Sequence, residues 1–302
     1  MLSESRRRKL EILTRSLAKG DLQAAERLLR SATRGKGLAA SGRMSQPAAL
    51  PAPASCPLGL EDAVPGVEAN QPPGKYWLVR RRLSQVSGDY LGVQRRYRSV
   101  LRGARQRIDE LTASPGLCHL SAATPEGPLF LDLETCGLAG CPVFLVGLMS
   151  YSQGHLVFEQ FLARHYGEEQ AILAEAARRI DQAGVLVTFN GKAFDMNMLR
   201  ERWAFHGIQS RSKPPHCDLL HESRRLWRGS VPNCRLQTLE QYLCNRRRVG
   251  DIPGSAIPQA YHDFVAGGDA RQLRAILHHN LLDLLTMAEL LCSALTGESP
   301  AG

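Results

Sequence analysis

The 302-residue sequence lacks any apolar run of about 18 residues, the length that a transmembrane helix needs. Its first residues, MLSESRRRKLEIL, have no apolar segment behind the positive charges, so they do not fit the pattern of a secretory signal peptide. The eight cysteines are scattered, with no CxxC pair and no spacing typical of a disulfide framework. We therefore expect a cytoplasmic protein with reduced thiols and no membrane association.

The charge of the chain is unevenly distributed. The sequence has 38 Lys and Arg against 29 Asp and Glu, a net charge of +9. Residues 1–125 hold 21 of the basic and 10 of the acidic side chains, so the remainder of the chain is slightly acidic. A basic protein attracts phosphate in a general way, but this asymmetry predicts at least two parts with different roles.

The sequence pattern divides the chain into five segments. Residues 1–32 predict a small amphipathic helical hairpin, which could bind a protein partner, and residues 33–75 are rich in Gly, Ala, Pro and Ser, as in a flexible linker. Residues 76–125 predict a basic strand and helix that lead into the domain of residues 126–293. Residues 294–302 are expected to form a disordered tail.

The segment from residue 126 onward has an α/β pattern. Three strand-like segments separated by glycine-containing turns predict a meander: PLFLDLE, VFLVGLMSY and HLVFEQFLA. A helix-like segment, the buried strand VLVTFN and a second amphipathic helix come next, and a long helix lies near the C-terminus. This order predicts a mixed sheet with helices on its faces.

The first candidate site residues are two acids on one predicted strand. Asp132 and Glu134 in LFLDLET are two residues apart, so their side chains point to the same face. A buried pair of carboxylates requires a metal ion, a shared proton or a basic partner. A half-solvated strand with a polar face is the commoner explanation of such a pair when it is taken alone.

The second candidate element is TFNGKAFDMNML. Asn190 begins a turn after the buried strand, and Asp195 falls in the first turn of the next helix. The helix dipole alone favours an acid there, but the carboxyl end of a buried strand is also where open α/β sheets bind ligands. Lys192 in the turn could contact a phosphate or simply be solvated.

The third candidate element is ILHHNLLDLL on the last predicted helix. His279 and Asp283 are four residues apart and project together from the helix, outside its leucine face. An Asp flanked by leucines is at least partly buried and needs a partner, which a salt bridge could also supply. Together with the first two elements, Asp283 completes a set of four acids of the kind that two-metal phosphoryl chemistry needs.

The three elements FLDLETCGL, LVTFNGKAFDMNML and HHNLLDLLTM resemble the three exonuclease motifs of the DEDD branch of the ribonuclease H-like superfamily. The further segments HCDLLHESRRLW, CRLQTLEQYL and GDIPGSAIPQAYHDF resemble the bacterial YprB-like ribonuclease H-like domain. The resemblance covers roughly residues 125–292. It implies an α/β fold with a five-stranded mixed sheet flanked by helices.

The resemblance also implies an activity and its residues. Asp132, Glu134, Asp195 and Asp283 would hold two Mg²⁺ or Mn²⁺ ions in a nuclease, expected to be a 3′–5′ exonuclease on single-stranded DNA or RNA. Related exonucleases carry a Tyr four residues or a His five residues before the last Asp, so His279 and His278 are both candidates to serve the attacking water. Helix geometry favours His279. We expect the substrate to contact three further residues, which are Thr135, Asn190 and Lys192.

The sequence departs from the family pattern in one place and leaves alternatives open elsewhere. Cys136 stands where a second Thr is usual, and the loop that follows is short, which brings substrate positioning there into question. A nucleic-acid-binding or adaptor module with little catalysis is the competing hypothesis.

Several other side chains have two explanations each. Asp218 could be an outer acid of the site or a helix cap. The arginine run 246–248 could hold phosphates or be a solvated helix end, and the aromatics interleaved with arginine could stack bases or pack in the core. These aromatics are Tyr76, Trp77, Tyr90 and Tyr97. A zinc site is a weaker alternative, because its ligands lack paired spacing; they would come from His216, Cys217, His221, Cys136 and Cys141.

Overall fold

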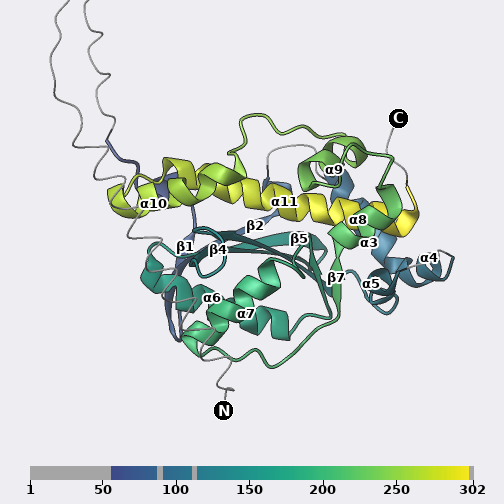
Figure 1. Cartoon of the computed structure of the whole chain (residues 1–302), viewed down its shortest axis with the longest axis horizontal. Helices are drawn as coiled ribbons and strands as arrows, with labels where there is room; N and C mark the ends of the chain where they lie inside the picture. The colour runs from purple at the N-terminus through teal and green to yellow at the C-terminus, as the bar shows by residue number, and fades with distance from the viewer. Residues whose placement is uncertain (1–55, 87–90, 111–113, 299–302) are drawn as a thin grey trace, which may run out of the picture. The chain divides into compact units, whose positions relative to one another are not determined.

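A computed structural model describes residues 56–86, 91–110 and 114–298 (Figure 1). Its strands are β1 (Val67–Gln71), β2 (Gly74–Arg82), β3 (Pro128–Thr135), β4 (Val143–Ser152), β5 (His155–Leu162), β6 (Val185–Thr188) and β7 (His216–Asp218). Its α-helices are α2 (Leu60–Ala63), α3 (Leu91–Arg102), α4 (Ala104–Glu110), α5 (Pro115–Cys118), α6 (Glu169–Asp181), α7 (Asp195–His206), α8 (Leu219–Trp227), α9 (Leu236–Leu243), α10 (Ile257–Gly267) and α11 (Arg271–Thr296). The predicted hairpin over 1–32 lies outside the described residues.

The strands form one mixed sheet in the order β1-β2-β5-β4-β3-β6-β7. The meander β3-β4-β5 is antiparallel, as predicted, whereas β6 and β7 run parallel to β3. The mixed α/β fold is therefore confirmed, but the strand number is seven rather than five. The two added strands are the antiparallel pair β1-β2, which pairs with the meander through β5.

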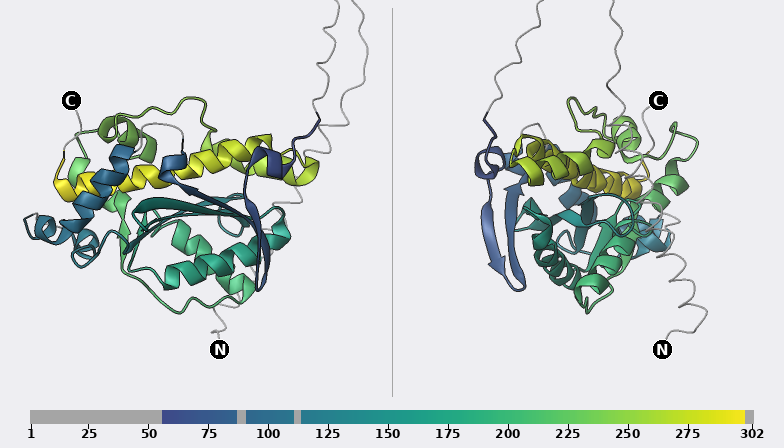
Figure 2. Two further views of the ribbon diagram at one scale, coloured as in Figure 1. Left: turned by 180° about the vertical axis from the view of Figure 1, so that it is seen from behind. Right: turned by 60° about the vertical axis from the view of Figure 1, so that its left-hand side comes forward.

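Helices cover both faces of this sheet (Figures 1 and 2). Helix α11 lies across one face with α3, α8 and α9 beside it, and α6 and α7 cover the other face. Strand β3 serves both faces, since its side chains alternate: Leu131 and Leu133 join one apolar cluster, and Phe130 joins a second one with the leucines of α11. Among the described residues, no helix is long and apolar enough to cross a membrane.

The described residues before position 126 belong to the same core as the rest of the sheet. Tyr76 and Trp77 on β2 and Tyr97 on α3 are buried, and the ring of Tyr97 lies 6.0 Å from that of Phe130. These three aromatics therefore pack in the core, which leaves their surface-stacking explanation without support; Tyr90 lies outside the described residues. Because α2 and β1 are folded, the expected linker also ends well before residue 75.

The last helix continues beyond its expected end. α11 runs to Thr296 and closes on Gly297 in a left-handed conformation. Glu298 follows, pairs with Arg96 of α3 and accepts the indole N–H of Trp227 through its backbone carbonyl at 2.9 Å. The disordered tail predicted over 294–302 is therefore wrong for residues 294–298.

Candidate active site

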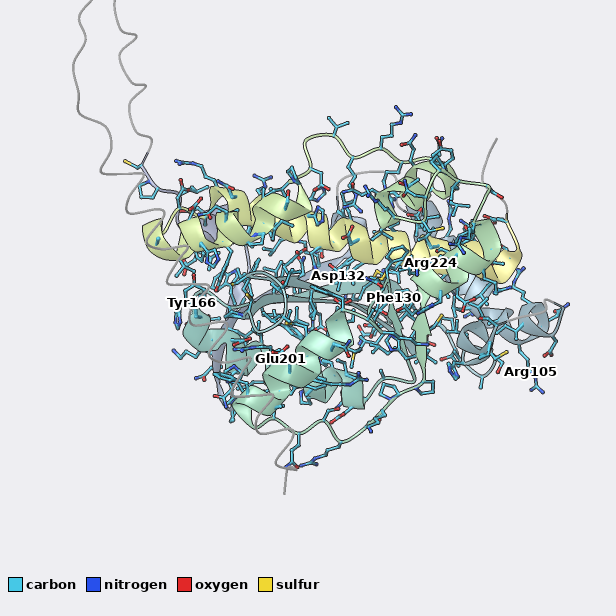
Figure 3. All side chains as sticks on the ribbon, viewed as in Figure 1. Arg105, Phe130, Asp132, Tyr166, Glu201 and Arg224 are labelled. Carbon is cyan, nitrogen blue, oxygen red and sulfur yellow. The ribbon has the colours of Figure 1, made fainter. Side chains whose placement is uncertain are left out.

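The two acids of β3 lie where the sheet changes from antiparallel to parallel. Strand β3 pairs with β6 only from Pro128 to Phe130, while its other edge stays paired with β4 as far as Thr135. Beyond Phe130 the strand therefore has one open edge. Asp132 and Glu134 are half-buried there on the face that α11 covers, and Figure 3 shows Asp132 between the sheet and that helix.

Asp195 reaches the same place from the other layer. It is the first residue of α7, directly after the turn that follows β6, and its side chain is buried. The backbone N–H of Leu133, on the open edge of β3, donates to its carboxylate, as does its own backbone N–H. Asp195 lies in the first turn of α7, as predicted, and this turn presents its carboxylate to β3.

Asp283 comes from the middle of α11 and is held by an arginine that sequence reasoning did not single out for this role. Arg248, in the loop between α9 and α10, donates from Nη2 to Asp283 Oδ1 at 2.5 Å and from Nε to Glu240 Oε2 at 2.6 Å. Arg246, from the same loop, binds Glu240 and, at 2.6 Å, Glu289. Two arginines of the run 246–248 are therefore committed to acids and do not form a solvated helix end.

The four predicted acids act on one another electrostatically. Burial and then the charges of Asp283, Glu134 and Asp195 hold the pKa of Asp132 well above its ordinary value. Burial and then the charges of Asp283 and Asp195 raise the pKa of Glu134 well above its ordinary value. Burial raises the pKa of Asp195 to about 7. Burial also raises the pKa of Asp283, against the charge of Arg248. Within the described residues, no Lys or Arg forms an ion pair with Asp132, Glu134 or Asp195.

Asn280 fixes the orientation of Asp132. This fully buried residue of α11 donates from Nδ2 to Asp132 Oδ2 at 2.8 Å, and its Oδ1 accepts from Gln160 Nε2 at 2.9 Å. Asp132, Gly147 and Gln160 are direct neighbours across β3, β4 and β5, so Asn280 lies over this row. Gly147 allows the close approach, because a Cβ there would stand 2.0 Å from Asn280 Oδ1.

A fifth acid, Asp251, lies beside the four predicted ones. It accepts from Arg248 Nη1 at 3.2 Å and its Oδ2 lies 2.8 Å from His279 Nδ1, while its Oδ1 is buried and has no hydrogen-bond partner among the described residues. Its charge contributes to the raised pKa of Glu134. The sequence signal for Asp251 was weak, since it lies in the irregular segment GDIPGS, outside the three exonuclease motifs.

The two candidate histidines differ in their surroundings. His279 is buried, with Nδ1 against Asp251 and Nε2 at 3.5 Å from Asp283 Oδ2. His278 is exposed and lines a small cavity with the loop residues 246–249. Partial desolvation of the ring lowers the pKa of His278, against the charge of Asp251. Only His279 has close contacts with acids of the site.

Asp218 has a structural role next to the site. Its buried carboxylate accepts the backbone N–H groups of Asn190 at 2.8 Å, Lys192 at 2.9 Å and Leu220 at 3.1 Å. Asp218 therefore caps α8 and fixes the turn that leads to Asp195. The helix-cap explanation of Asp218 is the one that these contacts support.

The three residues predicted to contact substrate are placed differently. Asn190 has a left-handed backbone conformation and lines a cleft together with Asp132 and Asp283. Lys192 is exposed, and its charge acts on His216 of β7. The Thr135 hydroxyl donates to the Gly137 carbonyl at 2.6 Å, which closes the short loop after β3. Asn190 is thus the one of these three that lines the cleft shared with two acids.

The chemistry of the donor set fits a hard divalent cation. Carboxylate oxygens are the ligands that such ions prefer, and the unpartnered Oδ1 of Asp251 adds a further oxygen on a side chain whose charge acts on Glu134. In the described part of the chain, however, no group of three or more His, Cys, Asp and Glu side chains is arranged to hold a metal ion. Arg248 meets the charge of Asp283 in this arrangement, and the other three acids act on one another electrostatically without forming a coordination shell.

Cys136 and Cys217 do not support the alternative of a zinc site. Cys217 is buried in the second apolar cluster on β7, and Cys136 packs on the first one after β3. Burial raises the pKa of each of these two thiols to about 12, so neither is poised as a thiolate. Both cysteines fit the description of small apolar side chains.

Comparison with known proteins agrees with this fold. Residues 129–294, more than half of the chain, match the RNase_H superfamily, so the chain belongs to that family. It is also similar to the uncharacterized protein YprB of Bacillus subtilis (strain 168), with 33% identity over 193 residues that cover 61% of this chain and 46% of YprB. The chain thus matches less than half the length of that relative.

A likeness to a solved structure is weaker. The crystal structure of E. coli Exonuclease I in complex with a dA16 oligonucleotide matches with a TM-score of 0.32 and 14% sequence identity, over 51% of this chain and 42% of that chain. The family assignment rests on the sequence matches.

Proposed function

We propose that the chain is a metal-dependent nuclease that hydrolyses phosphodiester bonds of single-stranded DNA or RNA. The observation that carries the proposal is the gathering of four acids at the sheet's switch point, three of them without a described basic partner. The charges of Asp283 and Asp195 raise the pKa values of Asp132 and Glu134 there. Acids in this arrangement need a counter-charge, and Mg²⁺ or Mn²⁺ supplies it. The 3′–5′ direction rests on the resemblance to the DEDD exonuclease motifs.

Asp132, Glu134, Asp195 and Asp283 would hold two divalent ions, which activate water and stabilise the leaving oxygen when bound. The chain itself orients these acids: Asn280 holds Asp132, and the Leu133 backbone holds Asp195. Arg248 donates to Oδ1 of Asp283, so Oδ2 of Asp283 is not bound by this arginine.

We propose that His279 takes the proton of the attacking water. Its Nδ1 is oriented by Asp251 at 2.8 Å, which turns Nε2 toward Asp283. An imidazole whose Nδ1 is held by a carboxylate presents its Nε2 as a general base. His279→Gln should then lower the cleavage rate by about 100-fold or more, the usual worth of a positioned base. His278→Gln is the matched control and should cleave within a few-fold of the wild type; the reverse order would assign the role to His278.

The competing function is a nucleic-acid-binding or adaptor module that cleaves little. The ion pair of Arg248 with Asp283 favours it, because an arginine then supplies the charge that a metal would otherwise bring.

Cleavage of an end-labelled single-stranded oligonucleotide with Mn²⁺ separates the two functions. The nuclease proposal expects a ladder of shortened products from the wild type, and none from Asp132→Asn or Asp283→Asn. Labels at the 5′ end and at the 3′ end, used in parallel, report the direction. If wild type and variants all bind the oligonucleotide and none cleaves it, the binding module is the better account.

A further inference from the structure

A cleft of about 780 Å³ opens directly beside Asp132 and Asp283. Most of its lining comes from α8 and from the loop between α8 and α9. The residues of this part of the lining that matter here are Arg224, Arg228 and Arg235. The cleft therefore joins the candidate active site to a wall that carries three guanidinium groups.

The three arginines are available to a ligand. All three are exposed, and no acid of the described residues forms an ion pair with any of them. Their neighbour Arg225 differs, because its Nε lies 3.3 Å from Glu222 Oε2. Arginines line this wall without carboxylate partners, although two acids of the site, Asp132 and Asp283, line the same cleft.

The wall is built on fixed backbone. Trp227, the last residue of α8, is buried and donates its indole N–H to the Glu298 carbonyl at 2.9 Å. A bridge between Arg228 and Val231 closes the turn after α8. Asn233 Oδ1 then accepts the backbone N–H of Arg235 at 3.0 Å and the Thr238 hydroxyl at 2.9 Å, which anchors the start of α9. The arginine positions are thus held at defined points along the cleft.

Apolar side chains line the same cleft. They are Phe189, Leu220, Val231 and Leu236, all partly or largely buried. Such a surface can contact the faces of unstacked bases, which a duplex keeps hidden inside its stack. Arginines, by contrast, bind the phosphates of either form.

We infer that this cleft binds single-stranded nucleic acid, with Arg224, Arg228 and Arg235 on successive phosphates and the apolar wall against bases. The strand then runs along the wall toward Asp132 and Asp283. The inference rests on the proposed function, because it names the surface and the residues that would hold the single strand at that site.

A second basic surface provides a matched control. Arg95, Arg98 and Arg102 are exposed along α3 at helical spacing, also without ion-pair partners in the described part of the chain. None of them lines the cleft beside the acids. Replacing three arginines by glutamine on either surface changes the net charge equally, so a difference in binding reports position.

The experiment measures binding by fluorescence anisotropy in EDTA, where no metal-dependent cleavage occurs. The probes are a fluorescein-labelled single-stranded oligonucleotide and the same sequence as a duplex, and the proteins are the full-length wild type, the cleft triple variant and the α3 triple variant. At about 0.1 M salt three lost phosphate contacts should weaken single-strand binding about 100-fold and reduce the salt slope by about 2. The α3 triple variant should lose at least ten times less affinity than the cleft variant.

A photo-crosslink locates the strand independently of affinity. An oligonucleotide with 4-thiothymidine should crosslink to the peptide that spans residues 220–236. The inference is overturned if both triple variants lose affinity equally, if the wild type binds the duplex as tightly as the single strand or binds neither, or if the crosslink maps elsewhere. Binding that depends on the cleft without any cleavage in Mn²⁺ would retain this inference and refute the nuclease proposal; cleavage without dependence on the cleft would do the reverse.

Discussion

Gly147→Ala tests the packing that orients Asp132. The new Cβ would stand 2.0 Å from Asn280 Oδ1 and 2.6 Å from its Cγ, and Asn280 cannot turn away without leaving Asp132 and Gln160. Forcing a methyl group into a packed core costs about 1–3 kcal/mol. Losing a buried hydrogen bond to a charged group costs about 1.5–3 kcal/mol more. We therefore expect the free energy of unfolding to fall by about 4 kcal/mol, and cleavage to fall with it.

Urea unfolding followed by tryptophan fluorescence measures this change. Gly267→Ala is the control, because Gly267 lies exposed in α10 with open space around it and should tolerate the methyl group. Asn280→Ala in the Gly147→Ala background removes the clash, so the double variant should recover about 2 kcal/mol relative to Gly147→Ala alone. The reasoning would be refuted if Gly147→Ala were as stable as the wild type, or if the double variant were less stable than Gly147→Ala.

Two further substitutions test the supports around the site. Glu169 accepts Val143 N–H at 2.9 Å and Arg202 Nε at 2.7 Å; burial raises its pKa, but these bonds outweigh burial, so its net pKa is lowered. The contribution of Glu169 to stability is thus present above about pH 4.5 and is lost as pH falls. Thermal melts of Glu169→Gln should show about 3 kcal/mol less stability at pH 7, and the stability of this variant should fall less steeply than that of the wild type as pH is lowered. An equally steep fall of stability in both proteins would contradict this. Asp218→Asn, which removes charge-assisted acceptors from the turn before Asp195, should cost about 2 kcal/mol in urea unfolding, and an unchanged midpoint would contradict it.

Local sequence patterns were sufficient for the main elements of the fold. The alternation around Asp132 predicts β3, and the leucine spacing around Asp283 predicts α11, because both signals reside in consecutive residues. Strand β1 could not be predicted in this way. Its side chains are almost all exposed, so it has no apolar alternation, and it exists because its backbone pairs with β2.

The supporting residues of the site were missed for a different reason. Asn280 contacts Asp132 across 148 residues of sequence, and Arg248 contacts Asp283 across 35. Neither residue has a local pattern that distinguishes it from a solvated polar side chain. Gly147 is similar, since a glycine in a strand indicates a close approach without naming the residue that approaches. Such contacts follow from the tertiary packing of α11 on the sheet.

The most direct test of a two-metal nuclease is a Mn²⁺ titration in which ion binding and cleavage are measured in the same samples. Electron paramagnetic resonance counts free and bound Mn²⁺, and gel analysis of a labelled single-stranded oligonucleotide measures cleavage. We expect about two ions per chain, with cleavage appearing as they bind, and loss of both in Asp132→Asn. Cleavage that persists in EDTA, or an Asp132→Asn variant that binds Mn²⁺ and cleaves like the wild type, would contradict the account.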